Sequence, residues 1–173
     1  MAGIIKAMDQ QWKDAVFLRA ATSALARIGD KRAIPELSDV GTLSLKVFSL
    51  TLGSTVHATE QAKDPRAEWW LQRRHISSVD MAVLWMDAYA AIAKMSPCRA
   101  MAMAQSMAGS SSEFQCLGAS WLANAAATKE NKHVPGALVI CQGALAKAKT
   151  AEVKQWVARL LEELKKAQAA ARR

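Results

Sequence analysis

The sequence has little of what disulfide-bonded domains, zinc modules and membrane proteins require. Its three cysteines, Cys98, Cys116 and Cys141, are odd in number and show no CxxC spacing. They exclude a disulfide framework or a cysteine-rich zinc module and favour a reducing, intracellular compartment. The longest weakly polar stretches, 81–93 and 134–146, are too short to span a bilayer. We therefore expect no transmembrane span, although association with a membrane complex stays open.

Recognisable catalytic and cofactor-binding patterns are also missing. The eight glycines are dispersed, and none belongs to a phosphate-binding loop. The histidines, His57, His75 and His133, are isolated along the chain. A zinc site needs three or four converging ligands, so we interpret His133 as a solvated or helix-capping residue. A nucleophilic Cys98 would need a neighbouring base, and the sequence indicates none.

Two other candidates have simpler structural interpretations. Cys116 falls on an apolar stripe with Leu117 and Trp121, which favours a small buried side chain. Asp80 and Asp87 are seven residues apart on one helical face, but no companion acid or base supports a catalytic pair. We therefore expect no enzymatic activity, no metal and no cofactor.

The composition predicts an all-α protein. Alanine, the strongest helix former, recurs in blocks such as 88–93 and 123–127. Alternating runs of β-branched residues, which would indicate strands, are nearly absent. The chain of 173 residues is long enough for one domain or one short array of repeats.

Short junctions recur along the chain at a nearly constant interval. Placing Ala33, Ala67, Ala100 and Val134 in register gives spacings of 34, 33 and 34 residues. Each junction carries Asp, Ser or Asn just before an apolar stretch, often with a proline nearby. Such residues cap free backbone N–H groups, and proline is tolerated in a first turn, so each junction is expected to begin a helix.

Aromatic residues give a second register. The spacings are 36, 37, 36 and 35 residues for Trp12, Phe48, Trp85, Trp121 and Trp156, each expected in the first helix of a unit. Together the registers predict a single helical-repeat domain over 1–173, a short α-solenoid of about five stacked antiparallel helical hairpins. Its units are approximately 9–41, 42–76, 77–109, 110–147 and 148–173, the last a capping helix.

Two segments resemble known repeat families. Residues 24–37, ALARIGDKRAIPEL, resemble the inter-helix junction of HEAT-like repeats, with a second echo in DPRA at 64–67. Residues 84–90, LWMDAYA, followed by the alanine-rich 99–107, are similar to pentatricopeptide repeats. The HEAT resemblance implies a protein scaffold, and the pentatricopeptide resemblance implies binding of single-stranded RNA.

Positive charge is concentrated near the C-terminus. Residues 129–173 carry ten basic and four acidic side chains, against a net charge of +8 for the whole chain. Such a region can attract phosphate or an acidic partner. The candidate contacts are Lys147, Lys149, Lys154, Arg159, Lys165, Lys166, Arg172 and Arg173. The alternative is a solvated capping helix, because Glu152, Glu162 and Glu163 interrupt the basic residues.

A tryptophan pair provides the second candidate surface. Adjacent residues on a helix point about 100° apart, so Trp69 and Trp70 cannot both enter one narrow stripe. With Arg73 and Arg74 they could form a partner contact. Six tryptophans and eight methionines also make a large adaptable apolar surface.

These features favour a non-catalytic scaffold or accessory subunit of a larger multi-protein complex, and an organellar complex is one such option. The alternative is a short RNA-binding repeat protein or ribonucleoprotein subunit that uses the basic C-terminal region. By fold-level analogy we expect a mitochondrial location, or otherwise a cytoplasmic one.

Overall fold

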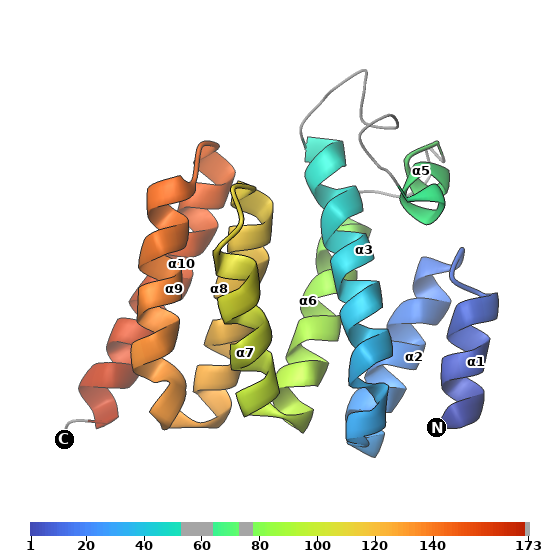
Figure 1. Cartoon of the computed structure of the whole chain (residues 1–173), viewed down its shortest axis with the longest axis horizontal. Helices are drawn as coiled ribbons and strands as arrows, with labels where there is room; N and C mark the ends of the chain where they lie inside the picture. Colours follow the sequence, from blue (N-terminus) through green and yellow to red (C-terminus); the bar gives the residue numbers. More distant parts are fainter. Residues whose placement is uncertain (53–63, 73–77, 172–173) are drawn as a thin grey trace. The chain divides into compact units, whose positions relative to one another are not determined.

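The computed structural model describes residues 1–52, 64–72 and 78–171, and within these ranges every regular element is helical (Figure 1). The prediction of an all-α protein is confirmed. The helices are α1 (Ala2–Gln10), α2 (Ala15–Ile28), α3 (Ile34–Leu52), α5 (Pro65–Gln72), α6 (Ser78–Met95), α7 (Pro97–Ala108), α8 (Glu113–Lys129), α9 (Val134–Lys147) and α10 (Ala151–Ala171). Two short 3-10 turns, η1 (Lys31–Ala33) and η2 (Asn131–His133), precede α3 and α9.

The chain divides into two compact units, unit 1 (Met1–Ala91) and unit 2 (Ile92–Arg173). Each unit is considered by itself. In unit 1, side chains from α2, α3, α5 and α6 surround a small apolar void. The lining includes one residue from each helix in turn, namely Leu18, Val47, Trp70 and Met81. Burial of these side chains removes apolar surface from water, which is the main stabilising contribution to such a core.

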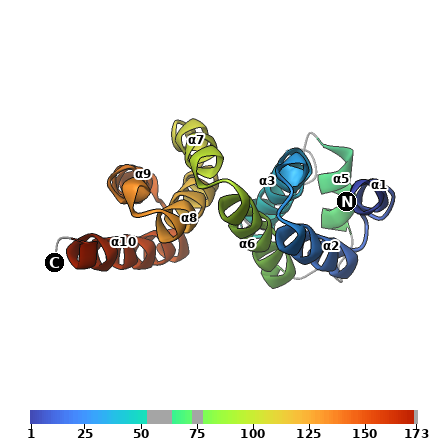
Figure 2. The same ribbon diagram turned by 90° about the horizontal axis from the view of Figure 1, so that it is seen from below.

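In unit 2, α8 packs against α7, α9 and α10. Viewed along the helices, α7 and α9 form one row and α8 and α10 a second row (Figure 2). Close packing is possible because α8 buries small residues around much of its circumference, including Gly118, Ala119, Ala123 and Ala126. On α10, one apolar stripe is buried, formed by Val153, Val157, Leu160, Leu161 and Leu164.

Several helices begin where the junctions predicted. Asp30 accepts a hydrogen bond from the Arg32 backbone N–H at 2.9 Å, and Asp64 accepts one from the Arg66 backbone N–H, also at 2.9 Å. These bonds satisfy backbone donors that the first turn of a helix leaves free. Upstream, α2 ends at Gly29, whose φ of 72° is accessible to glycine without the steric penalty of a side chain.

The other two junctions begin helices by a different route. Ser96 precedes α7, but its side chain makes no capping hydrogen bond, and Pro97 is the first residue of the helix. Asn131 lies inside η2 and does not cap α9. Capping by Ser96 and Asn131 was therefore wrongly predicted. At Pro97 the proline itself favours the helix start, since its fixed φ suits the first turn.

The aromatic register is correct for three of its five members. Trp85, Trp121 and Trp156 lie in α6, α8 and α10. Trp12 lies between α1 and α2 instead of in a helix, because the Asp14 carboxylate accepts the Phe17 N–H at 2.9 Å and starts α2 after it. Phe48 lies in α3, which is continuous across the expected boundary between residues 41 and 42.

Candidate functional site

A groove lies in unit 1 between the starts of α2 and α6. It has a volume of about 500 Å³ and is lined by Lys13, Asp14, Ala15, Val16, Arg19, Asp80, Val83 and Leu84. Val16 is 80% exposed, and Val79, one turn before Val83 on α6, is 65% exposed. Single exposed apolar side chains are ordinary on protein surfaces, whereas two beside one groove indicate a contact surface. We call this feature the unit 1 groove.

Charges of both signs surround the apolar part of the unit 1 groove. The Arg19 Nε donates to Asp87 Oδ2 at 3.0 Å, with both side chains well exposed. Asp14 is engaged as the cap of α2, and Asp80 lies on the opposite wall. An exposed ion pair contributes little stability, so the Arg19–Asp87 pair adds little to the folding free energy of unit 1.

The predicted tryptophan contact is divided between the interior and the surface of unit 1. Trp70 is only 2% exposed, so a partner cannot reach its ring without opening the unit. Trp69 is half-buried and packs edge-on against Trp12, with ring centroids 5.3 Å apart. The Lys13 Nζ lies 5.4 Å from the Trp12 centroid and 5.3 Å from that of Trp69, within cation–π range. The other two candidates, Arg73 and Arg74, lie outside the described residues.

Some of the predicted basic contacts serve the fold of unit 2. Lys147 Nζ donates to the carbonyl oxygens of Ala108 at 2.9 Å and Ser110 at 3.1 Å, at the C-terminal end of α7. A cation is favourable there because helix C-termini leave carbonyls unsatisfied. The Lys149 backbone N–H donates to Glu113 Oε2 at 2.6 Å, which anchors the start of α10.

The remaining basic residues on α10 are exposed but divided. At about 100° per residue, Lys154 and Lys165 lie along one edge of the exposed face, and Arg159 and Lys166 lie along the other. Glu162 stands between them and pairs with Lys165 at 2.9 Å. Lys165, and beyond it Lys166, lower the pKa of Glu162. The exposed face is therefore mixed in charge, and Arg172 and Arg173 lie outside the described residues.

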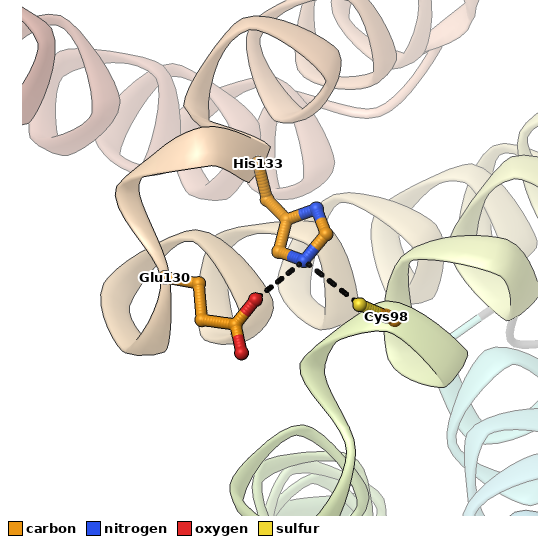
Figure 3. A group of neighbouring side chains, drawn as sticks. All are labelled: Cys98, Glu130 and His133. Carbon is orange, nitrogen blue, oxygen red and sulfur yellow. Dashed lines mark hydrogen bonds and ion pairs between the residues drawn. The ribbon is translucent and has the colours of Figure 1, made fainter.

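Unit 2 brings together three potential metal ligands that the sequence analysis did not connect. Cys98 Sγ lies 3.7 Å from His133 Nε2, and Glu130 Oε2 lies 3.3 Å from the same nitrogen. Figure 3 shows the thiol and the carboxylate approaching one ring nitrogen from different sides, while the second nitrogen points away from both. The three ligand atoms all lie within 4.8 Å of one another. We call these residues the Cys98 cluster.

Lys132 is the charged neighbour of the Cys98 cluster. Its Nζ lies 2.6 Å from Glu130 Oε2, and its side chain is 63% exposed. Lys132, followed by His133, lowers the pKa of Glu130, so the carboxylate stays ionised at neutral pH. Glu130 in turn raises the pKa of Lys132, and the Cys98 sulfur adds to that effect. An exposed ammonium thus lies beside the ligands, where another cation could bind.

Cys98 and His133 come from two of the predicted junctions. They are 35 residues apart in the sequence, and each lies at or beside the start of a helix in the same row of unit 2, α7 or α9. The prediction of His133 as an isolated residue was wrong for this reason, and combining the junction register with residue chemistry could have found the pair. His57 and His75 lie outside the described residues.

The other candidate nucleophiles and acids fit their simpler interpretations. Cys116 is 1% exposed, which confirms the prediction of a small buried side chain. Burial raises the pKa of Cys116 and raises that of Cys141 to about 11, so both thiols are poor nucleophiles at neutral pH. Asp87 accepts a hydrogen bond from Arg19.

Comparison with known proteins found no matching family, no matching curated protein and no matching solved structure. Among the residues that the structure describes, none of the helices combines the length and apolar character that crossing a bilayer requires.

Proposed function

We propose that the chain is a non-catalytic scaffold or accessory subunit of a larger multi-protein complex, and that the unit 1 groove holds an amphipathic segment of a partner protein. The observation that carries this proposal is the 80% exposure of Val16 in the wall of the groove, together with the 65% exposure of Val79, which precedes the lining residue Asp80 in the sequence. Covering these side chains would remove apolar surface from water, which is the usual driving force for protein association.

The surroundings of the valines favour a protein over a nucleic acid. Protein interfaces combine an apolar centre with a polar rim. In the unit 1 groove, Val16, Val83 and Leu84 supply the apolar part of the lining. Lys13, Asp80 and Arg19, which is paired with Asp87, supply charges of both signs. A phosphate backbone would favour a uniformly basic lining, whereas a peptide with charges of both signs complements this one.

The proposal extends to the architecture of the whole chain as a short α-solenoid of about five hairpins, HEAT-like or pentatricopeptide-like. The two helical rows of unit 2 support it, because each helix there packs on its neighbours in chain order. Stacked hairpins present broad surfaces to several partners at once, which suits a scaffold. A mitochondrial location remains part of the proposal and can be tested by fractionation of cells that express the full chain.

The RNA-binding alternative receives less support from the basic residues. Lys147 is engaged by carbonyls of unit 2, and Glu162 divides the exposed face of α10. Filter binding with single-stranded RNA at two salt concentrations separates the two functions. Micromolar or tighter binding that weakens steeply with salt would replace the scaffold proposal.

Site-specific photo-crosslinking in the native cells tests the scaffold proposal. A photo-reactive phenylalanine derivative is placed at position 16, 79 or 139 of the full chain. Val139 on α9 is a matched control, since it is a valine with 67% exposure that lies in unit 2. We expect the same protein to be crosslinked from positions 16 and 79 and not from position 139.

Charge substitutions give the quantitative counterpart. Val16→Glu and Val79→Glu should each reduce co-purification of the crosslinked protein at least about tenfold, because a buried unpaired carboxylate costs more than the 1.4 kcal/mol that this factor represents. Val139→Glu should leave co-purification unchanged. Equal losses in all three variants, or no loss in any, would contradict the assignment of the unit 1 groove.

A further inference from the structure

We infer that Cys98, Glu130 and His133 form a zinc-binding site in unit 2. The site is separate from the unit 1 groove and does not depend on the proposed scaffold function. Thiolate sulfur, imidazole nitrogen and carboxylate oxygen are the three donor types that zinc takes from proteins. Sulfur and nitrogen ligands favour zinc, whereas a surface group made only of carboxylates would favour calcium or magnesium.

The distances agree with tetrahedral zinc. Zinc bonds of about 2.3 Å to sulfur, 2.0–2.1 Å to nitrogen and 2.0–2.2 Å to oxygen place nitrogen about 3.5–3.6 Å from sulfur and about 3.3–3.5 Å from oxygen at tetrahedral angles. The His133 nitrogen lies 3.7 Å from the Cys98 sulfur and 3.3 Å from the Glu130 oxygen. The Cys98 sulfur and the Glu130 oxygen are at most 4.8 Å apart. Their distance therefore needs to shorten by no more than about 1.2 Å to match tetrahedral coordination.

The orientation of His133 also favours a metal over hydrogen bonds alone. Both neighbours approach Nε2 (Figure 3). If Nε2 carries a proton, one N–H is shared between the thiol and the carboxylate; if it does not, Nε2 accepts from the thiol and the carboxylate has no bond to the ring. A lone pair on Nε2 directed at an ion between the three atoms satisfies all of them together. The His133 side chain is only 13% exposed, so its ring is held in place by the surrounding structure.

Lys132 competes with zinc for the Glu130 carboxylate. Its ammonium lies 2.6 Å from Glu130 Oε2 and must leave the carboxylate when zinc arrives. The side chain is 63% exposed and can turn into solvent without breaking the core. In the described part of the chain, the cluster contains one Cys, one Glu and one His, which leaves the fourth zinc position to water or to another molecule. The site is therefore expected to bind zinc reversibly.

Zinc would connect the start of α7 to the turn between α8 and α9. Cys98 belongs to the first turn of α7. Glu130 and His133 lie at the two ends of the turn between α8 and α9. Such a link holds two successive hairpins of unit 2 at one end. An ion that binds only the folded state stabilises it by mass action, so zinc should raise the melting temperature of the chain.

Titration of the purified, metal-free full chain with Zn²⁺ and with Co²⁺ tests the inference. Co²⁺ reports both tetrahedral geometry, by its visible absorption, and thiolate ligation, by near-ultraviolet charge transfer. We expect one ion per chain, a charge-transfer band, and protection of Cys98 against alkylation by iodoacetamide. Cys116 and Cys141 are buried and do not obscure the alkylation of Cys98.

Four variants make the test specific. Cys98→Ser, Glu130→Gln and His133→Gln should each weaken zinc binding by more than the about 10–100-fold that loss of an outer-shell partner costs. Lys132→Met should strengthen binding several-fold, because it removes the competing ammonium. A purely structural hydrogen-bonded cluster would not respond to Lys132→Met in this direction. Glu152→Gln, an exposed carboxylate elsewhere in unit 2, should have no effect.

Circular dichroism checks that each variant is folded. Because Cys98 is exposed, Cys98→Ser should fold and keeps the test decisive if His133→Gln fails to fold. A wild-type chain that binds Co²⁺ without a thiolate band would overturn the inference. Unchanged zinc affinity in Cys98→Ser would overturn it as well and would leave the cluster as a thiol–imidazole hydrogen bond. Neither result would bear on the crosslinking at Val16 and Val79.

Discussion

Gly41 is the position where unit 1 depends most directly on the absence of a side chain. It lies in the interior of α3, against Tyr89 of α6, which is fully buried. A Cβ at position 41 would fall 2.8 Å from Tyr89 Cδ1, closer still to Cε1, and 3.4 Å from the Ala88 Cβ. The ring cannot withdraw easily, because it packs against Trp85 with centroids 5.9 Å apart. Gly41→Ala should therefore destabilise the protein.

The magnitude follows from two opposing effects. Forcing an extra methyl group into a well-packed core costs about 1–3 kcal/mol. Replacing a glycine by alanine inside a helix returns about 0.5–1 kcal/mol through backbone entropy. Since the overlap at Tyr89 involves a packed ring, we expect the upper part of the cost and a net loss of about 1–2.5 kcal/mol. For a chain of 173 residues this lowers the melting temperature by about 2–10 °C.

Thermal and urea unfolding of Gly41→Ala and Gly143→Ala provide the assay. Gly143 is a matched control, because it also lies in a helix interior, in α9, and a Cβ there meets nothing within 4 Å. Gly143→Ala should stabilise the protein by about 0.5–1 kcal/mol. Tyr89→Leu in the Gly41→Ala background should recover part of the loss, as expected for residues in contact. Equal stabilisation by both alanine variants would refute the close approach of α3 and α6.

The remaining predictions concern two capping carboxylates. Arg32 lowers the pKa of Asp30 to about 2 from 3.8, through its side chain and its backbone N–H. The ionised form thus contributes stability above pH 3.8 that is lost as the pH falls toward 2, so Asp30→Asn should lower the melting temperature at pH 7 and not at pH 2, as measured by calorimetry. Glu113 Oε2 accepts hydrogen bonds from the Lys149 and Thr150 backbone N–H groups at 2.6 and 3.0 Å. Glu113→Ala should cost about 1.5–3 kcal/mol in urea unfolding, against a few tenths for the exposed Glu152→Ala; a similar small cost for both would refute this cap.

Helix class and many helix starts could be predicted because they depend on local chemistry. Asp30 and Asp64 cap backbone N–H groups within two residues, and Pro97 fits a first turn without any distant partner. The apolar stripe of α10 is equally local, since its period alone determines which face can be buried. Such features require no knowledge of which helices become neighbours.

The aromatic register failed where a local signal outweighed it. Trp12 stands at an interval that suits a repeat, but Asp14 begins α2 two residues later. An aromatic residue can pack from a turn as well as from a helix, and Trp12 does so against Trp69. Equal spacing of large apolar residues therefore indicates a common core and not a common helical position.

The Cys98 cluster could not be predicted from residue spacing within one segment. Its members come from two junctions, and their contact depends on how α7 and the turn before α9 pack against α8. Metal motifs are usually recognised when ligands lie within one short stretch of sequence. Here Glu130 and His133 satisfy that condition, but the third ligand, Cys98, lies 35 residues before His133.

In unit 1, an ion pair links the junction that begins α5 to α3. Arg66, in the junction that begins α5, donates to both carboxylate oxygens of Asp39 on α3 at 2.6 and 3.1 Å and also approaches Asp64. These two carboxylates raise the pKa of Arg66 and keep the pair ionised. A guanidinium thus bridges a carboxylate on α3 and the carboxylate that precedes α5 in unit 1, where a cation in unit 2 would bridge Cys98, Glu130 and His133. The exposed ammonium of Lys132 already pairs with the Glu130 carboxylate. Zinc would replace this ion pair by a metal–ligand bond with a defined direction. Helix starts that lie close together within a unit therefore concentrate charge and ligands even where no single segment carries a recognisable motif.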